Sequence, residues 1–492
     1  MGEDLAMDKS QVIITTLIVY KIVLIAIGFI AERRNKDASD FFLGGRGLGP
    51  VVAAISASAS SSSAWTLLGA TGFAYSKGLA ALWLFPACVG GFVINWYLLA
   101  PAIRKFSGAQ DAVTVTDVLA GRPGREGYTL VRRIAAFIVL VFFSFYVAAQ
   151  FKAAGTAFEG VFDTSFTASV IIGGSIVVFY TLMGGFWAVS ITDTLQGLLM
   201  AITAIVLPWI AFYKLGYSGL TEGLQAVGET GFLDLSSGFE GPAAFGFVLG
   251  LLGIGLGYPG QPHVVNRFLA LKKGEQHLAQ ARCIAVAWSA VVYVGVILLG
   301  LCGRVLYPSL GNGETIFFVA ADGLMHPILA GLMVAAVLSA IMSTADSQLL
   351  VAASAVTHDL ECGGNNNRTR LFRSRLTIVV ISMVAMLIAM QRDSTIFDKV
   401  LFAWSAMGAA FGPLLLVSVL KGPVKGRRTA LAMLTGFGLV VLNELLKTTD
   451  FYSGNTAGWA GFGERIIPFF TALAVVLAPG GQETSDSRWS SG

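Results

Sequence analysis

The sequence predicts an all-α polytopic membrane protein, and three observations lead to this fold class. First, 55% of the residues are hydrophobic and only 13% are charged, whereas a soluble protein carries about 25% charged residues. Second, long apolar segments recur along the chain, each close to the roughly 20 residues that cross a bilayer as a helix. Third, glycine is frequent, with 58 residues, as is typical of helices that pack closely within a membrane.

The apolar segments predict about thirteen transmembrane helices in one membrane domain. They lie near residues 11–31, 50–74, 80–102, 131–151, 167–187, 193–213, 243–262, 283–303, 327–356, 374–391, 397–419, 428–446 and 465–479. The first segment follows an acidic start and reads as a true span, so no cleavable signal peptide is expected. Residues 480–492 are polar and are expected to form a cytoplasmic tail.

Lysine and arginine predict the orientation of the chain in the membrane. Most of the 33 basic residues fall in segments that are cytoplasmic if the N-terminus lies outside. By the positive-inside rule, this predicts an external N-terminus and a cytoplasmic C-terminus in the plasma membrane. His263 and Arg267 follow the seventh span and are expected at the cytoplasmic face. Because this rule accounts for the short basic clusters, nucleic-acid binding is not expected.

Two spans carry residues that interrupt helices. The second contains the serine-rich stretch ISASASSSSAW over 55–65, and the seventh reads GLLGIGLGYPGQP over 250–262. Close packing through small residues is an alternative for the serine stretch. Interrupted segments at corresponding positions of two halves indicate a transporter site. We therefore expect two five-helix repeats, about 50–213 and 243–419, with accessory helices over 11–31, 428–446 and 465–479.

The ninth span, over 327–356, places polar side chains in the middle of an apolar segment. Ser343, Asp346 and Ser347 share one helical face, and Thr344 lies beside them. A carboxylate within a membrane is costly unless it faces protein, water or a cation. Hydroxyl, carbonyl and carboxylate oxygens suit a small hard cation. The pattern predicts half of a Na⁺ site, with the serine stretch of the second span as the other half.

Three further polar side chains lie within apolar surroundings. Asp193 begins the sixth span, where it can cap a helix N-terminus or take part in function. Tyr146 and Tyr258 lie inside spans, where each hydroxyl needs a hydrogen-bond partner. Either tyrosine is structural, or it gates a cavity. The four histidines and four cysteines show no metal-binding spacing, so a zinc site is not expected.

These residues resemble the sodium/solute symporter family, including its bacterial sodium/proline symporters. The resemblance extends from DFFLGGRGLGP at 40–50 to WSAMGAAFGP at 404–413. Its most specific stretches are SASASSSSAW (56–65), GGFWAVSITDTLQ (184–196), GLGYPGQPHVVNRF (255–268) and IMSTADSQLLVAASAVTHDL (341–360). The resemblance implies a LeuT-like inverted-repeat core that works by alternating access with Na⁺ as the coupling ion.

The resemblance also implies three groups of site residues. The main Na⁺ site would use the backbone carbonyls of Ala59, Ser62 and Ala340 with the hydroxyls of Ser343 and Thr344. A second Na⁺ site of some relatives would correspond to Asp193, Ser343, Asp346 and Ser347. The solute site of the proline symporters would correspond to Ser63, Ala64, Tyr146, Tyr258 and Pro262.

The chain departs from the typical proline-symporter pattern at three positions. Proline symporters typically have aspartate at the position of Ser61, serine at that of Asp346 and tryptophan at that of Ile254. We hypothesise that the first two are one change, in which a carboxylate moves across the same cation site. The missing tryptophan removes a large ring from the expected solute pocket and leaves the solute open.

The leading prediction is a Na⁺-coupled importer of a small solute, with L-proline as the leading candidate. It is expected to lie in the bilayer and to need no obligate protein partner. Another amino acid, a betaine-like zwitterion, a sugar acid or a monocarboxylate is an open alternative for the solute. A non-transporting sensor on the same fold is a second alternative. A membrane enzyme is not expected, because no nucleophile–base or metal constellation is apparent.

Overall fold

The computed structural model describes residues 9–32, 47–110, 112–162, 164–183, 186–360, 367–391 and 395–480. These residues are nearly all helical, and one parallel β-bridge joins Leu48 to Leu271. Ten helices among them are long and apolar enough to cross a membrane, and three shorter apolar helices accompany them. The predicted all-α membrane fold is thus confirmed, while the number thirteen stays a prediction.

The helices follow one another along the chain with short connections. Their bounds are α1 (Lys9–Glu32), α3 (Pro50–Ser61), α4 (Thr71–Lys77), α5 (Leu84–Val93), α6 (Ala100–Gln110), α7 (Val115–Ala120), α8 (Tyr128–Phe162), α9 (Phe166–Met183), α10 (Phe186–Ala226), α11 (Gly241–Leu252), α12 (Pro262–Ala270), α13 (Glu275–Leu306), α14 (Ile316–Leu324), α15 (Pro327–Ser354), α16 (Asn367–Ala389), α17 (Ile396–Lys421), α18 (Gly426–Lys447) and α19 (Ala460–Leu477). Three short helices of other pitch matter below: η2 (Trp65–Ala70), η5 (Gly253–Gly260) and η7 (Ala355–Asp359).

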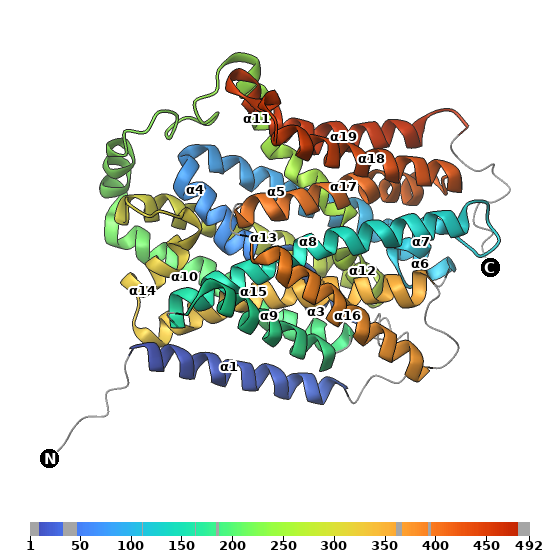
Figure 1. The fold of residues 1–492 in the computed structure, drawn as a ribbon, viewed down its shortest axis with the longest axis horizontal. Coiled ribbons are helices and arrows are strands. Elements are labelled where there is room, and N and C mark those ends of the chain that lie inside the picture. The colour runs from blue at the N-terminus through green and yellow to red at the C-terminus, as the bar shows by residue number, and fades with distance from the viewer. Residues whose placement is uncertain are drawn as a thin grey trace.

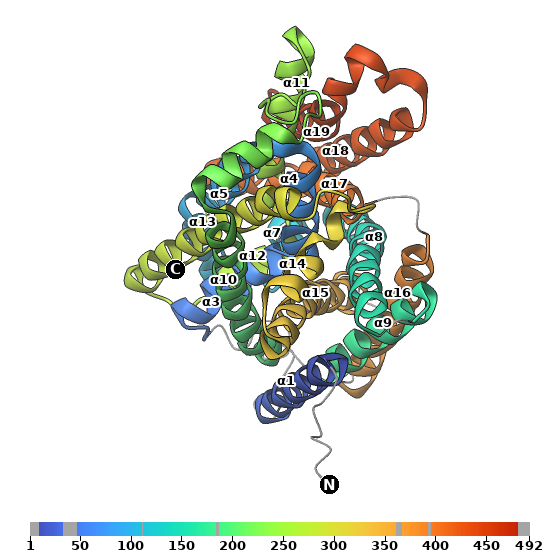
Figure 2. The ribbon, with the colours of Figure 1, turned by 90° about the vertical axis from the view of Figure 1, so that its left-hand side faces the viewer.

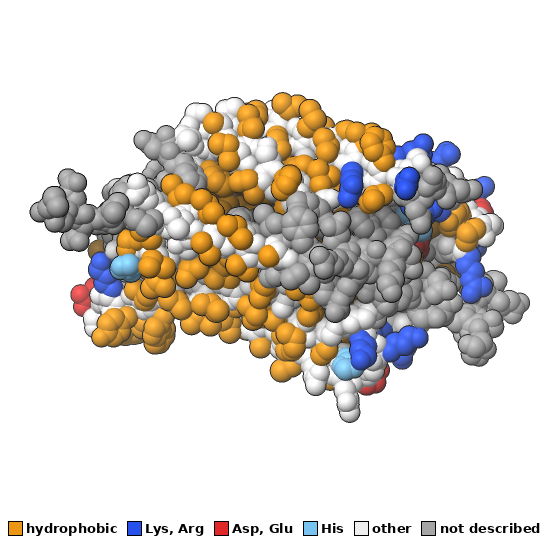
Figure 3. Space-filling model, turned by 90° about the horizontal axis from the view of Figure 1, so that it is seen from below, with side chains coloured by type: hydrophobic (Ala, Val, Ile, Leu, Met, Phe, Trp, Pro, Cys, Tyr) orange, Lys and Arg blue, Asp and Glu red, His pale blue; other side chains and the backbone are white. Residues whose placement is uncertain are grey.

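Most of the long helices run along the longest axis of the molecule (Figure 1). Seen end-on, α3, α12 and α15 lie in the interior, whereas α1 and the pair α18 and α19 lie at opposite margins (Figure 2). On the face drawn in Figure 3, apolar side chains cover much of the described surface, and most of the visible Lys and Arg side chains gather toward one end. This arrangement is that of a helical bundle with a lipid-facing apolar belt.

The helix of the second span breaks at Ser62, as predicted from the serine stretch. Ser62 leaves helical geometry with φ −114° and ψ 76°, and a π-helical turn resumes at Trp65. The break takes the amide N–H of Ala64 out of the helical ladder, and this N–H donates to the side-chain amide oxygen of Gln150 at 3.2 Å. The N–H of Trp65 donates to the Ser63 hydroxyl, also at 3.2 Å.

The helix of the seventh span breaks where glycine and proline predict it. After α11, the chain forms the 3₁₀-helical segment η5, and Gln261 is extended with φ −94° and ψ 102°. The Gln261 side chain donates to the carbonyls of Gly257 at 3.0 Å and Trp404 at 3.1 Å. The Gln261 side chain therefore satisfies a backbone carbonyl of the interrupted segment, as a membrane interior requires, and ties that segment to α17.

The structure excludes one of the two alternatives for Asp193 and contradicts the expected position of His263 and Arg267. Asp193 does not lie at a helix N-terminus, because α10 begins at Phe186 and Asp193 sits two turns inside it. The hydropathy of the sequence marks the apolar part of that helix and not its start. His263 and Arg267 are not at a cytoplasmic face, since they are 0% and 1% exposed. After its break the seventh span continues as α12, which packs against α3 and α15 in the interior.

Candidate functional site

The broken helix α3 meets the middle of α15, and this contact brings together the residues expected to bind Na⁺. The Ser343 hydroxyl lies 3.3 Å from the Ala59 carbonyl of α3 and 3.3 Å from the Ala340 carbonyl of its own helix. The Thr344 hydroxyl donates to the Ser60 carbonyl at 3.1 Å. All of these groups are buried.

The oxygens at this contact fit a small hard cation. Two oxygens that bind one such cation at roughly 2.4 Å lie about 3.4 Å apart when they subtend a right angle. The single hydroxyl proton of Ser343 cannot serve the carbonyls of Ala59 and Ala340 at once. The buried Ser62 hydroxyl has no hydrogen-bond partner among the described residues. A cation here would therefore satisfy oxygens that the protein leaves short of donors.

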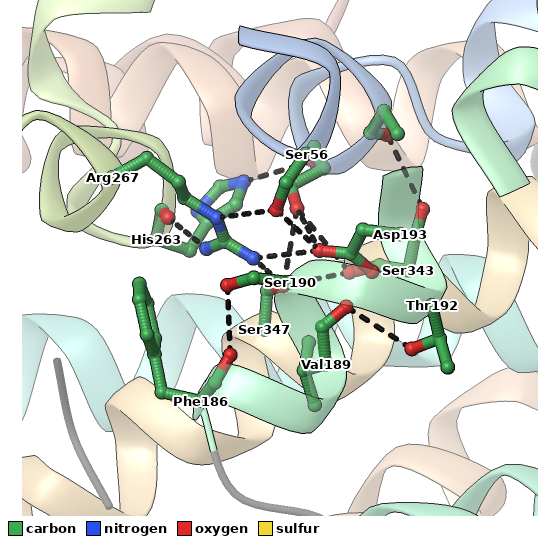
Figure 4. A network of polar contacts seen from close by, with 12 residues as sticks. Ser56, Phe186, Val189, Ser190, Thr192, Asp193, His263, Arg267, Ser343 and Ser347 are labelled. Carbon is green, nitrogen blue, oxygen red and sulfur yellow. Dashed lines mark hydrogen bonds and ion pairs between the residues drawn. The ribbon is translucent and has the colours of Figure 1, made fainter. Parts of the chain in front are cut away.

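A second polar network centres on Asp193 and Arg267 (Figure 4). The Arg267 guanidinium lies 2.8 Å from the Asp193 carboxylate, which also accepts from Ser56 at 2.8 Å and from Ser60 at 3.2 Å. Arg267 also donates to the hydroxyls of Ser56 at 3.2 Å and Ser347 at 2.5 Å. Helices α3, α10, α12 and α15 thus meet around one buried ion pair.

This network includes part of the set implied for a second cation. Asp193 and Ser347 both contact Arg267, and Ser343 is joined to Ser347 by a hydrogen bond to its carbonyl at 2.7 Å. Asp346 instead accepts a hydrogen bond from Thr181 of α9. The positive charge beside Asp193 in this structure is therefore a guanidinium supplied by α12.

A small cavity of about 10 Å³ lies beside the breaks of both interrupted helices. Its lining residues are Ser61, Trp65, Tyr146, Ile254, Tyr258, Val400, Leu401 and Trp404. Tyr146 and Tyr258 line the cavity, whereas the other three residues of the implied solute set lie outside its lining. Of these, Ser63 is hydrogen-bonded to Tyr146, Ala64 to Gln150, and Pro262 begins α12.

Aromatic rings fix the shape of the cavity. The Trp404 indole N–H donates to the Ile254 carbonyl at 3.0 Å. Its ring meets the Tyr258 ring edge-on with the centroids 4.7 Å apart. A methyl group at Gly257 would lie 2.0 Å from the indole nitrogen. The unwound segment η5 thus needs glycine at this point so that Trp404 can reach it.

A cluster of rings and a carboxylate hold the start of α17 against the cavity. Phe397 stacks on Trp65 at 5.4 Å and on Phe73 at 4.7 Å between ring centroids. The Glu314 carboxylate accepts from the backbone N–H groups of Ile396 at 3.0 Å and Phe397 at 2.9 Å. Both carboxylate oxygens thus hold the N-terminus of α17, which carries the cavity residues Val400, Leu401 and Trp404 further along.

Comparison with known proteins identifies the family. The model of the sodium:solute symporter family matches residues 41–436. The chain belongs to the sodium:solute symporter family. As a member, this symporter couples solute transport to Na⁺, and the resemblance found in its sequence is confirmed.

Curated relatives and solved structures agree with this assignment. The symporter is 35% identical over 453 residues to the osmoregulated proline transporter OpuE of Bacillus subtilis, covering 89% of this chain and 91% of the relative. It is 36% identical over 414 residues to a sodium/proline symporter of Staphylococcus aureus, covering 82% and 80%.

The fold is that of known LeuT-like transporters. A Na⁺-coupled sialic acid symporter, solved in an outward-open state, has a TM-score of 0.76 at 17% identity, covering 97% of this chain and 100% of that chain. MhsT in complex with L-phenylalanine has a TM-score of 0.52 at 15% identity, covering 87% and 98%. These likenesses confirm the predicted LeuT-like architecture.

Several residues of the symporter's site were not found from the sequence. Ser56 and Ser60 lay within the serine stretch without an assigned role, and Arg267 was counted as a cytoplasmic charge. The sequence pattern does not mark Trp404 or Gln150, because single aromatic or amide residues in apolar helices carry no spacing signal. One feature of the sequence indicates that Arg267 could pair with Asp193. The two residues carry opposite charges, and each lies beside an apolar segment.

Proposed function

We propose that this symporter imports L-proline together with Na⁺ across the plasma membrane. The observation that carries this proposal is the joint presence of proline-transporting relatives over most of the chain and a cation-fitting contact beside an aromatic cavity. Proline has an apolar ring and a zwitterionic end. An aromatic cavity beside a helix break offers surfaces suited to both.

Ala59, Ser62, Ala340, Ser343 and Thr344 are proposed as the Na⁺ ligands. A cation among these oxygens draws the α3 break toward α15, and the same break carries Ser63 and Ala64 of the proposed solute site. Na⁺ binding therefore favours the break geometry that holds the solute. By thermodynamic linkage, each ligand then tightens binding of the other by the same factor.

Asp193, Asp346 and Ser347 are proposed to host a second Na⁺ only after Arg267 moves. A buried carboxylate that already pairs with a guanidinium has little to gain from another cation. In the conformation described here, Arg267 therefore keeps this region neutral without Na⁺. The proposed transport step through this conformation involves one Na⁺ at the contact between α3 and α15.

The symporter is proposed to place its N-terminus outside and its C-terminus in the cytoplasm. The start of α1 and the end of α19 lie at opposite ends of the molecule (Figure 1). The end that α19 reaches is the one where most Lys and Arg side chains gather (Figure 3), as the positive-inside rule requires of a cytoplasmic face. Each Na⁺ entering along an inward-negative potential gains about 2.3 kcal/mol per 100 mV.

A different small solute is a second candidate, and one lining residue favours it. Ile254 forms part of the cavity wall, where its aliphatic side chain leaves space that a larger ring would fill. Such a cavity accommodates solutes with bulk at that position, including other amino acids and betaine-like zwitterions.

Uptake of labelled proline into proteoliposomes tests the proposal. We expect accumulation with an inward Na⁺ gradient and none when K⁺ replaces Na⁺. A panel of unlabelled amino acids, betaines, sugar acids and monocarboxylates, added as competitors, then ranks the solutes. Na⁺-dependent uptake of another solute, without competition by proline, would overturn proline as the cargo and leave Na⁺ symport intact.

A further inference from the structure

Gln150 of α8 is a buried glutamine with one half of its side chain unused. Its side chain is 0% exposed, and its amide oxygen accepts the N–H of Ala64 at 3.2 Å. Since that N–H is a donor, the oxygen and not the nitrogen of the carboxamide must face it. The amide nitrogen has no hydrogen-bond partner among the described residues. Native structures rarely bury such a donor without a role for it.

The position of Gln150 links it to the proposed solute site. Ala64 directly follows Ser63, and Ser63 is hydrogen-bonded to the Tyr146 hydroxyl. Tyr146 lines the cavity and precedes Gln150 by one helical turn on α8, so the two residues lie on the same helical face. The buried carboxamide therefore lies at the α3 break, one helical turn along α8 from a residue of the cavity wall.

A second unused donor lies in the same place. The indole nitrogen of Trp65 is buried without a hydrogen-bond partner among the residues that the structure describes, and Trp65 lines the cavity. One unused donor belongs to a residue of the cavity wall, and the other lies one helical turn from Tyr146 of the same wall. Because the lining has no carboxylate side chain, these donors call for an acceptor from outside the protein. The carboxylate of a zwitterionic solute has the required acceptor capacity and charge.

We propose that Gln150 is a solute-binding residue whose amide nitrogen donates to the carboxylate of the transported zwitterion. This inference rests on the proposed function, because it assigns a contact within that solute site. The amide oxygen of Gln150 keeps the Ala64 N–H engaged, and the amide nitrogen recognises the carboxylate. One side chain thereby ties the helix break to the solute and makes carboxylate-bearing solutes preferred over their amides.

Isosteric substitution separates this role from a purely structural one. Gln150→Glu keeps an oxygen for the Ala64 N–H but replaces the donor with a second acceptor. Gln150→Met removes both the amide oxygen that accepts the Ala64 N–H and the amide nitrogen that donates. Gln196→Met is the matched control, because Gln196 is also a fully buried glutamine, yet neither half of its amide has a partner among the described residues, so it makes no hydrogen bond to the α3 break.

The experiment measures the concentration of labelled proline that gives half-maximal uptake into proteoliposomes at saturating Na⁺. Prolinamide is added as a competitor. Wild type should prefer proline to prolinamide. Gln150→Glu should raise the half-saturating proline concentration at least tenfold. The prolinamide concentration that halves uptake should stay within twofold of the wild-type value. Gln150→Met should also lose the preference, and Gln196→Met should keep it. Equal weakening of both solutes, or an unchanged preference in both Gln150 variants, would overturn the proposal.

Failure of the proposed function gives a different result. If wild type transports another carboxylate-bearing solute and not proline, proline import is wrong, and the same variants test Gln150 with that solute and its amide. If the solutes that drive Na⁺-dependent uptake lack a carboxylate, the role of Gln150 is overturned as well. Thermal unfolding of each purified variant, with and without Na⁺, tests whether folding and cation binding are retained.

Discussion

Arg267 and Asp193 form an ion pair with 2.8 Å between guanidinium nitrogen and carboxylate oxygen, and their side chains are only 1% and 0% exposed. The pair joins α12, which follows the break of the seventh span, to α10. Because Ser56 and Ser60 also bind Asp193, the serine stretch of the second span meets the same point. Both interrupted helices are therefore tied to one buried charge pair.

Removing one member of this pair should cost more than removing both. Asp193→Asn leaves the guanidinium buried and unpaired, which typically costs about 3–5 kcal/mol. The double variant Asp193→Asn with Arg267→Met carries no unpaired charge and should recover much of that loss. Thermal unfolding in detergent measures this directly. A double variant as unstable as the sum of the two single variants would contradict the coupling of the pair.

The sequence located the breaks but not this ion pair, and the reason is physical. Serine, glycine and proline act on the backbone locally, so Ser62 and the 253–260 segment could be found from composition alone. Arg267 depends on where α12 travels after the break, and that path is set by packing against distant helices. A charge just beyond an apolar segment was therefore assigned to the membrane surface, although α12 carries it into the interior.

The contact between α3 and α15, where we propose that Na⁺ binds, was predictable from the sequence to the level of a helix face. Hydroxyls within an apolar helix identified Ser343 and Thr344, and their contact with Ala59 and Ser60 follows that prediction closely. The cavity was less predictable, since Trp404 and Val400 belong to a helix with no polar pattern to mark it. Such residues become visible only when the helices are assembled.

Loss of the Ser343 hydroxyl should weaken Na⁺ binding with little effect on folding. Ser343→Ala removes the oxygen that lies between two carbonyls, so we expect the half-saturating Na⁺ concentration to rise at least tenfold, about 1.4 kcal/mol. Ser339→Ala is the control, because Ser339 is also buried on α15, but its hydroxyl contacts the Ala335 carbonyl of its own helix and the Tyr20 hydroxyl of α1 and makes no hydrogen bond to the described residues of α3. Equal Na⁺ dependence in both variants would refute the assignment of Ser343.

Adding a methyl group at Gly257 should distort the cavity. The new Cβ would lie 2.0 Å from the Trp404 indole nitrogen, so Trp404 must shift away from the Ile254 carbonyl. We expect Gly257→Ala to lower the affinity for the solute at least tenfold. Gly90→Ala, with no atom within 4 Å of its added Cβ, should transport normally. Normal transport by Gly257→Ala would show that Trp404 does not need its present position.

Asp117 of α7 should make the stability of the symporter sensitive to acid. Burial raises the pKa of Asp117, but the hydrogen bond and charge of His358 outweigh it, and the net pKa lies below the ordinary value of 3.8. A carboxylate with a depressed pKa contributes stability above its unfolded pKa and loses it as pH falls through the folded pKa. Wild type should therefore unfold at a higher temperature than Asp117→Asn at neutral pH.

This difference in unfolding temperature should shrink as the solution is acidified below the ordinary carboxyl pKa of 3.8, because the carboxylate becomes protonated there. Scanning fluorimetry across this range measures it for both proteins in the same detergent and salt. A difference that is constant with pH would show that the ionised carboxylate of Asp117 adds no stability.

The central claim is that one Na⁺ between α3 and α15 and the solute beside the same break stabilise each other. Equilibrium binding of proline at several Na⁺ concentrations, with the reverse titration of Na⁺ at several proline concentrations, tests it most directly. The account predicts that each ligand lowers the dissociation constant of the other by one common factor, and that Ser343→Ala reduces this factor toward one. Proline binding that is independent of Na⁺ in wild type would contradict it.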